Sequence, residues 1–380
     1  MFFDSIAITV SVLLVLLTVW SSLSDTLRRN VVSDDGEGEN VDAGKPISVI
    51  VVSDNNADAL SANLPVYLSQ DYPAGYEVIV VVDRDEDGTA DVLKSFNDNP
   101  LLYTTFVPDS SRYMSRRKLA ITLGVKAAKN EWILLTDAAA CPVSGQWLRQ
   151  MSSHCRNGID MVIGYSGFAD EASSFKRFYR LHRSCSYFHD AVRARAYGMA
   201  GCNLMLRKSM FMAGNGFLGN LKYLRGEFEF LVNKYSDGTN VAVATVPDSY
   251  IVEEAPSLKK WHDMNVFHVE TRRHLSRGFR HCAAFVSDVL SLSVCLLASI
   301  AALVWAVLAS RLVILPFAVV AIVLPVLFRT LAARHIMEVF GVRVPVWLAV
   351  PFEVRLVWHN LKYTLLHKLS DKNEFISHKS

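Results

Sequence analysis

A long uncharged apolar run lies near the start of the chain, from Ile6 to Trp20. With its apolar flanks it approaches the roughly 20 residues that a helix needs to cross a bilayer. A signal peptide is the alternative, but the residues before the run carry Asp4 and no Lys or Arg. We therefore predict a membrane anchor over residues 1–27. Because Arg28 and Arg29 follow it, the chain after them is expected in the cytoplasm.

Two further apolar runs, Phe285–Ala309 and 312–328, are separated only by Ser310 and Arg311. This pattern predicts a tight transmembrane hairpin over residues 281–330. Basic residues flank the hairpin on the side that faces the cytoplasm in this arrangement, namely Arg272, Arg273, Arg277, Arg280, Arg329 and Arg334. They agree with the orientation inferred from the first run.

The C-terminal part, residues 331–380, contains a mixed stretch in which Trp347 and Trp358 alternate with charged residues such as Glu353 and Arg355. Aromatic and charged residues on one amphipathic helix are typical of the membrane interface. The stretch is therefore predicted to be an interfacial or re-entrant helix, and a membrane span is the alternative.

Between the membrane segments, short apolar runs alternate with segments of helical periodicity. The runs are Ile47–Ser53, Tyr76–Asp83, Asn130–Asp137 and Ile159–Ser166, and they are rich in β-branched residues. Such runs mark strands buried on both faces of a parallel sheet. The alternation predicts a doubly wound α/β domain over residues 46–280, preceded by an acidic linker over 28–45.

Composition narrows the class of protein. Hydrophobic residues make up 51% of the chain and the formal net charge is only +2, which fits a membrane protein and argues against a nucleic-acid partner. The six cysteines show no CxxC pair or nearby histidine spacing, so they predict reduced thiols and neither a zinc site nor a disulfide framework.

Two of the predicted strands end in a carboxylate, Asp83 and Asp137. Ligands of doubly wound sheets bind beyond the carboxyl ends of the strands, so these two residues mark the candidate site. Aspartate is also a common turn residue after a strand, which is the alternative for either one alone.

Three segments together resemble the family 2 glycosyltransferases, in particular the membrane-anchored bacterial ones with a C-terminal hydrophobic hairpin. ISVIVVSDNNADALSANLPVYLSQDYP resembles the opening strand and helix, SRRKLAITLGVKAAKNEWILLTDAAAC the approach to the aspartate-x-aspartate motif, and GMAGCNLMLRKSMFMAGNGF the acceptor-side stretch. The likeness covers about Pro46 to Arg280. It implies a GT-A-like fold, a nucleotide-sugar donor, a glycan or lipid-linked acceptor, and Mg²⁺ or Mn²⁺.

The resemblance also implies roles for particular residues. Asp83 would bind the nucleotide base, and Asp137 would be the first aspartate of the metal and ribose motif. Lys118 would approach the diphosphate, with a solvated helix face as the alternative. The other implied residues are the acidic pair Glu227 and Glu229, one of which would deprotonate the acceptor, and the acceptor-side Gly201, Asn203, Arg207 and Trp261.

Several of these motifs depart from the family pattern. Ala139 stands where the family has its metal-binding aspartate, and alanine offers no oxygen to a hard cation. Phe228 interrupts the acidic cluster, so the base survives if Glu227 occupies the base position and is lost if Phe228 does. The basic residues expected soon after Trp261 are absent, and substitution by Arg272, Arg273 and His274 after an insertion is the alternative. With Asp137 alone, the motif predicts weak donor binding that changes little without cation, and a gain of cation dependence in Ala139→Asp.

Two functions remain open. The first is an active transferase at the cytoplasmic face of the inner membrane, working on a lipid-linked or envelope glycan. The second is a non-catalytic relative that acts as a membrane scaffold or partner of another glycosyltransferase. The joint departures at Ala139, Phe228 and the Trp261 segment favour the second, whereas the retained Asp83, Asp137 and Glu227 favour the first.

Overall fold

The computed structural model describes residues 5–29, 44–108, 115–193 and 195–376. The chain divides into two compact units. One comprises Met1–Asn30, Ser174–Ser186 and Arg277–Lys362, and the other Val31–Ser173, Tyr187–Ser276 and Tyr363–Ser380. Most of the linker predicted over 28–45 lies outside the described residues.

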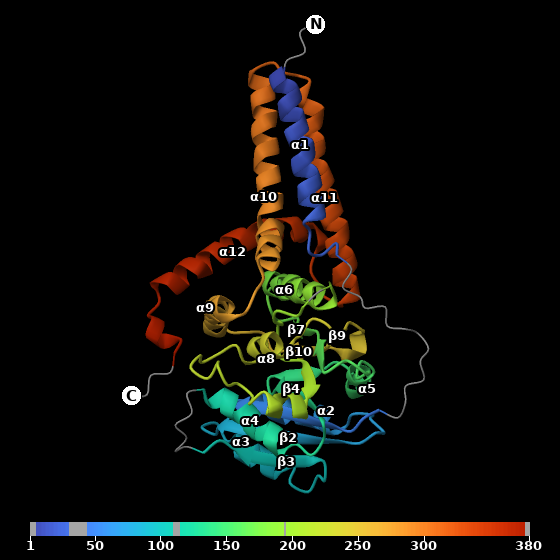
Figure 1. Cartoon of the computed structure of the whole chain (residues 1–380), viewed down its shortest axis with the longest axis vertical. Coiled ribbons are helices and arrows are strands. Elements are labelled where there is room, and N and C mark those ends of the chain that lie inside the picture. Colours follow the sequence, from blue (N-terminus) through green and yellow to red (C-terminus); the bar gives the residue numbers. More distant parts are fainter. Residues whose placement is uncertain (1–4, 30–43, 109–114, 194, 377–380) are drawn as a thin grey trace. The chain divides into compact units, whose positions relative to one another are not determined.

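The second unit contains a seven-stranded sheet with the strand order β3-β2-β1-β4-β8-β6-β9 (Figure 1). In this order the strands are β3 (Leu102–Phe106), β2 (Tyr76–Arg84), β1 (Ile47–Asp54), β4 (Trp132–Asp137), β8 (Leu204–Arg207), β6 (Met161–Gly164) and β9 (Val241–Ala244). The first four run parallel, and β1, β2 and β4 are buried along almost their whole length. Continuous runs of apolar, β-branched residues are typical of such strands, because helices cover both faces of the sheet and no face needs polar side chains.

The predicted α/β class is confirmed, but the sheet is mixed. Strand β8 pairs antiparallel with both β4 and β6. The predicted run Ile159–Ser166 is also divided, because β6 ends at Gly164 and β7 (Ser166–Phe168) joins a separate three-stranded sheet. The other strands of this small sheet are β5 (Ala140–Pro142) and β10 (Ile251–Glu253), which pair with each other antiparallel.

Helices lie between the strands of this unit, namely α2 (Ala57–Leu68), α3 (Thr89–Lys94), α4 (Arg116–Ala127), α5 (Trp147–Ser152), α7 (Lys208–Ala213), α8 (Glu227–Tyr235) and the 3-10 turn η1 (Pro247–Ser249). Helix α9 (Leu258–His274) follows the last strand. Helix α4 lies especially close to the sheet at Gly124. A Cβ there would come within 2.5 Å of Ile50 and 3.1 Å of Val81. Glycine therefore lets α4 approach β1 and β2, and this approach sets the position of the first turn of α4.

The first unit contains three helices that are long and apolar enough to cross a membrane: α1 (Ser5–Leu23), α10 (Phe279–Leu308) and α11 (Ile314–Val339). They pack against one another (Figure 1), and Trp20 Nε1 of α1 donates to Ser287 Oγ of α10 at 2.7 Å. The predicted anchor and hairpin thus correspond to helices. The 3-10 turn η2 (Val346–Leu348) leads into α12 (Ala349–Leu369), which is not among the helices apolar enough to span.

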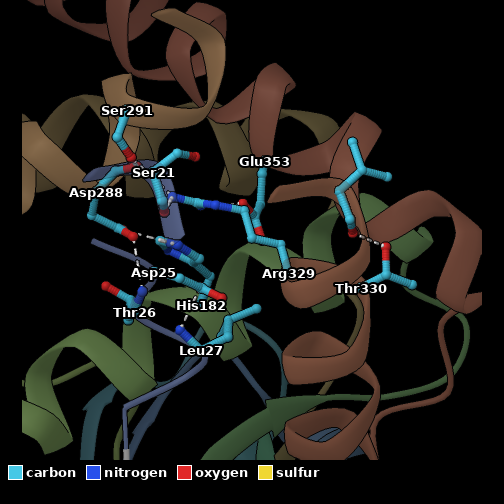
Figure 2. A network of polar contacts seen from close by, with 11 residues as sticks. Ser21, Asp25, Thr26, Leu27, His182, Asp288, Ser291, Arg329, Thr330 and Glu353 are labelled. Atoms are coloured by element: carbon cyan, nitrogen blue, oxygen red, sulfur yellow. Dashed lines mark hydrogen bonds and ion pairs between the residues drawn. The ribbon is translucent and has the colours of Figure 1, made fainter. Parts of the chain in front are cut away.

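A buried network of charged side chains ties these helices together (Figure 2). Arg329 of α11 is 1% exposed and pairs with Glu353 of α12. Its second terminal nitrogen donates to the Ser21 carbonyl oxygen at 2.8 Å and to Ser291 Oγ at 2.9 Å. One guanidinium therefore links α11, α12, α10 and the end of α1.

The same network includes a histidine–aspartate pair. His182 lies in helix α6 (Ser174–Arg193), within the part of α6 that belongs to this unit, and its Nε2 is 3.1 Å from Asp288 Oδ2. The other oxygen of Asp288 accepts from the Thr26 backbone at 2.9 Å. Asp25 is also buried, and its pKa is raised chiefly by that burial. The cluster thus holds three acids, Asp25, Asp288 and Glu353, and the charge of Arg329 acts on all of them, together with His182.

Replacing Arg329 by methionine should therefore destabilise the first unit strongly, because Glu353 would stay buried without its partner. Removing one member of a buried ion pair costs about 3–5 kcal/mol. The matched control is Arg334→Met on the same helix, since Arg334 is 62% exposed and its pair with Glu338 is a surface pair. The midpoint of thermal unfolding in detergent should fall for Arg329→Met and change little for Arg334→Met. Equal midpoints for the two variants would contradict this assignment.

Candidate functional site

The candidate site lies at the carboxyl ends of the parallel strands. Asp137 is the last residue of β4 and is in register with Val52 of β1, while Val82, just before Asp83, is in register with Ser53. Both aspartates therefore end at the same edge of the sheet, one on each side of β1. This is the edge at which doubly wound sheets bind their ligands.

Asp83 is held by the first residue of α4. Arg116 Nε donates to Asp83 Oδ1 at 2.7 Å, and a terminal nitrogen of Arg116 donates to the Asp83 backbone carbonyl. Burial raises the pKa of the Asp83 carboxyl, and Arg116 offsets part of this effect. The carboxylate is thus fixed in orientation at the strand end, where it could accept hydrogen bonds from a planar ring.

Asp137 is held by the next residue. Arg117 pairs with Asp137 Oδ2, while Asp137 Oδ1 accepts from the Ala139 backbone at 2.9 Å. Burial alone would raise the pKa of Asp137, but Arg117 and these hydrogen bonds hold it below its usual value. Lys260, in the first turn of α9, also lowers it through its positive charge.

Arg117 also reaches the acidic cluster on α8. Its Nε is 3.9 Å from Glu227 Oε2, and the side chains of Arg117 and Glu227 are 16% and 7% exposed. Helix α8 begins at Glu227 because Gly226 has a φ of +89°, and a Cβ on Gly226 would lie 2.5 Å from Thr271. Among the described residues, Glu227 Oε1 is buried without a hydrogen-bond partner.

Glu229 has a different partner from Glu227. Its Oε1 lies 2.8 Å from His268 Nδ1 of α9, and both residues are buried. Phe228, between the two acids, is 8% exposed and belongs to the core. The structure therefore brings Glu227, and not Glu229, together with Asp137 through Arg117.

Lys118 is placed differently from its predicted role. Its Nζ donates to the backbone carbonyls of Asn220, at 2.7 Å, and Tyr223, and it lies 4.9 Å from the centre of the Phe230 ring. The side chain is 0% exposed, so it does not form the solvated helix face. Burial lowers the pKa of Lys118 to about 8. Lys118 thus holds the segment from Asn220 to Tyr223, which precedes α8, through hydrogen bonds.

The acceptor-side residues separate into two groups. Asn203 is buried and donates to the Tyr165 and Ser249 carbonyl oxygens at 3.1 and 2.9 Å, so it joins parts of the domain. Gly201 has a φ of +93°, which glycine adopts readily, and it thereby allows the chain to bend just before Asn203. Arg207 is in register with Trp132, at the opposite end of β4 from Asp137, and pairs with Asp160 at 2.9 Å. The structure does not bring Arg207 to the candidate site.

Trp261 lies in the first turn of α9, and its ring meets Phe168 of β7 edge to face at 6.3 Å. Its neighbour Lys260 is the α9 residue whose charge acts on Asp137. Sequence reasoning missed Arg116, Arg117 and Lys260. The signal for the first two was the run of three cations directly after Ser115, whose side chain caps α4 by accepting from the Lys118 backbone.

The site does not fit a divalent cation. Ala139 contributes no ligand, one oxygen of Asp137 is paired with Arg117, and the other accepts from a backbone N–H. Within the described ranges, no group of three His, Cys, Asp or Glu side chains could hold a metal ion. Magnesium and manganese need several oxygen ligands, and a guanidinium beside the remaining carboxylate opposes them.

Residues 48–214 match the sequence model described as glycosyl transferase family 2. They form a glycosyl transferase family 2 domain. This region contains Asp83, the α4 cations and Asp137, whereas Glu227 lies beyond its end. No curated protein matches the chain by sequence.

Two solved structures are similar to this chain. A mannosyltransferase, PcManGT from Pyrobaculum calidifontis, solved with GDP-Man and Mn²⁺, is similar over 95% of this chain and 97% of its own, with 16% identity and a TM-score of 0.57. Residues 1–349 of S. aureus TarS, solved with UDP-GlcNAc, share 12% identity over 83% of this chain and 92% of their own, with a TM-score of 0.40. The first likeness shows a GT-A type fold.

The placement of Lys118 leads to a stability prediction. Lys118→Met should destabilise the family 2 domain by about 2 kcal/mol, because a buried cation that donates to two carbonyls is replaced by a side chain that donates to none. Thermal unfolding of Lys118→Met and of Lys126→Met, on the same helix, gives the comparison. A stable Lys118→Met protein with weakened donor binding would instead support the role at the diphosphate.

Proposed function

We propose that this protein is a membrane-anchored glycosyltransferase that transfers a sugar from a nucleoside diphosphate donor to an acceptor hydroxyl. The observation that carries the proposal is the convergence of Asp83, Asp137 and Glu227 on the first turn of α4, within or directly after a family 2 domain. Three fixed carboxylates at the ligand-binding edge of the sheet supply the groups that this reaction needs.

In the proposed donor site, Asp83 accepts hydrogen bonds from the nucleotide base and Asp137 faces the ribose and diphosphate. Arg116 and Arg117 hold the two carboxylates in place. Such preorganisation matters because a misplaced donor loses most of the benefit of proximity.

Glu227 is the proposed general base. The acceptor oxygen forms a bond to the anomeric carbon, and the bond from this carbon to the diphosphate oxygen breaks. The electron pair leaves with the nucleoside diphosphate, and the acceptor proton passes to Glu227. A buried Oε1 without a partner in the described structure is suited to accept that proton, whereas the Glu229 carboxylate is already bound to His268.

The acceptor is proposed to be a lipid-linked or envelope glycan, and the domain over about 46–280 to face the cytoplasm of the inner membrane. The three apolar helices and the basic residues around them support this arrangement. The 281–330 hairpin and the 331–380 interfacial segment would then hold the domain at the bilayer surface.

A non-catalytic role as partner of another glycosyltransferase is the second candidate. The observation in its favour is that Arg117 pairs with Asp137 and Glu227 at once, so that both carboxylates already have a partner. Donor hydrolysis and sugar transfer, measured in detergent with a panel of nucleotide sugars and membrane-extract acceptors, separate the two candidates. Turnover above that of Asp83→Asn supports the transferase, and its absence for every donor supports the partner role.

The two acids of α8 should behave differently. Glu227→Gln should lower kcat by about 100-fold or more, the usual contribution of a general base, while donor affinity changes little. Glu229→Gln should instead lower the unfolding midpoint, because it weakens the buried pair with His268. Both replacements keep the side-chain shape. A larger loss of kcat in Glu229→Gln than in Glu227→Gln would reverse the assignment.

The proposed orientation can be tested with introduced cysteines. The native Cys155 is a poor probe, because burial raises the pKa of its thiol to about 12. Asn97→Cys lies in the exposed turn that follows α3, and Leu308→Cys lies at the end of α10 and is 80% exposed. An impermeant thiol reagent added to intact cells should label Leu308→Cys and not Asn97→Cys. The opposite pattern would contradict the orientation.

A further inference from the structure

Arg117 occupies the place where a metal-dependent site would concentrate negative charge. Its guanidinium touches Asp137 through a terminal nitrogen and approaches Glu227 through Nε, and its side chain is only 16% exposed. A planar guanidinium can bridge two carboxylates in this way because its donors are fixed in a fork. Arg117 thus places a cation between the proposed donor-binding acid and the proposed base.

The loss at Ala139 and the position of Arg117 are compatible with each other. Ala139 is 4% exposed, and its backbone N–H occupies the second oxygen of Asp137. A carboxylate and a divalent cation added here would meet a guanidinium a few ångströms away. Beside Asp137 the described residues therefore provide a guanidinium and no group of three side chains that could hold a metal ion.

Positive charge is present at the donor position without a metal. Arg117 lies between Asp137 and Glu227, Lys260 acts on Asp137 through its charge, and Lys118 interacts in the same way with Glu227. A diphosphate adds negative charge, so it would compete with the carboxylates for these cations. Hydrogen bonds from guanidinium groups to phosphate are strong and commonly bidentate.

We propose that Arg117 takes over the charge-offsetting role of the divalent cation, so that this protein binds its nucleoside diphosphate donor without Mg²⁺ or Mn²⁺. The inference rests on the proposed function, because it assumes that the same edge of the sheet binds the donor. On binding, Arg117 moves from Glu227 to the diphosphate, and Glu227 becomes available to the acceptor proton. Donor binding and release of the base are thereby coupled through one side chain.

The test is calorimetric titration of the purified full-length protein in detergent with UDP, GDP and a panel of their sugars. Each titration is done with EDTA and with Mn²⁺. The wild type should bind at least one donor with affinities that differ less than twofold between the two conditions. An affinity that falls tenfold or more in EDTA would overturn the inference while leaving the proposed function standing.

Variants of Arg117 give the second arm. Arg117→Gln should weaken donor binding about tenfold or more, equivalent to about 1.4 kcal/mol, with no rescue by Mn²⁺. Arg117→Lys keeps the charge but not the fork, so a smaller loss is expected, and it remains informative if Arg117→Gln does not fold. The control is Arg149→Gln, an exposed arginine on α5. Unchanged binding in both Arg117 variants would overturn the inference.

The third arm tests whether a carboxylate at position 139 can make donor binding depend on a cation. Ala139→Asp alone should not create cation dependence, because Arg117 would pair with the new carboxylate. This differs from the expectation drawn from the motif alone. Arg117→Gln combined with Ala139→Asp should bind donor at least tenfold more tightly with Mn²⁺ than with EDTA. Strong Mn²⁺ dependence in the single Ala139→Asp variant would contradict the proposed role of Arg117. If the wild type binds no donor in either condition, the proposed function and the inference are both overturned.

Discussion

The site depends on the first turn of α4, where three consecutive cations must each find a partner in a largely buried place. Arg116 pairs with Asp83, Arg117 with Asp137 and Glu227, and Lys118 with the backbone carbonyls before α8. Uncompensated buried charge is costly, so each pairing constrains the position of a different segment. The cap by Ser115 and the close approach at Gly124 hold this turn against the sheet. The strand ends and α8 are thus positioned by one short piece of helix.

Much of the fold could be predicted from the sequence because its signals are local. Continuous apolar runs gave β1, β2 and β4, and uncharged runs of membrane length gave α1, α10 and α11. The antiparallel β8 was missed because its four residues lie within a stretch that resembled a motif and carry no distinctive period. The small sheet was missed because its strands have three residues each, too few for periodicity to register.

The site was only partly predictable for a different reason. Asp83 and Asp137 could be found because strand ends meet at one edge, but the partners of a charged side chain depend on long-range packing. Lys118 and Arg117 are adjacent and chemically alike in the sequence, yet one lies against carbonyls and the other against carboxylates. Arg329 is a second example. From the sequence it was one of the basic residues that flank the hairpin and indicate its orientation, whereas the structure buries it among α10, α11 and α12.

The departures from the family motifs follow a common physical logic. Arg117 bridges Asp137 and Glu227, and position 139 holds an alanine that packs at 4% exposure and offers no oxygen ligand. Successive residues of α8 point in different directions, so Phe228 can join the core while Glu227 turns toward Arg117 and Glu229 toward His268. The acid that remains beside Arg117 is therefore the one whose reactivity a bound diphosphate would change. The alanine at position 139 and the glutamate at position 227 are therefore both consistent with the proposed donor site, in which Arg117 would pair with the carboxylates before the donor binds and with the phosphates afterwards.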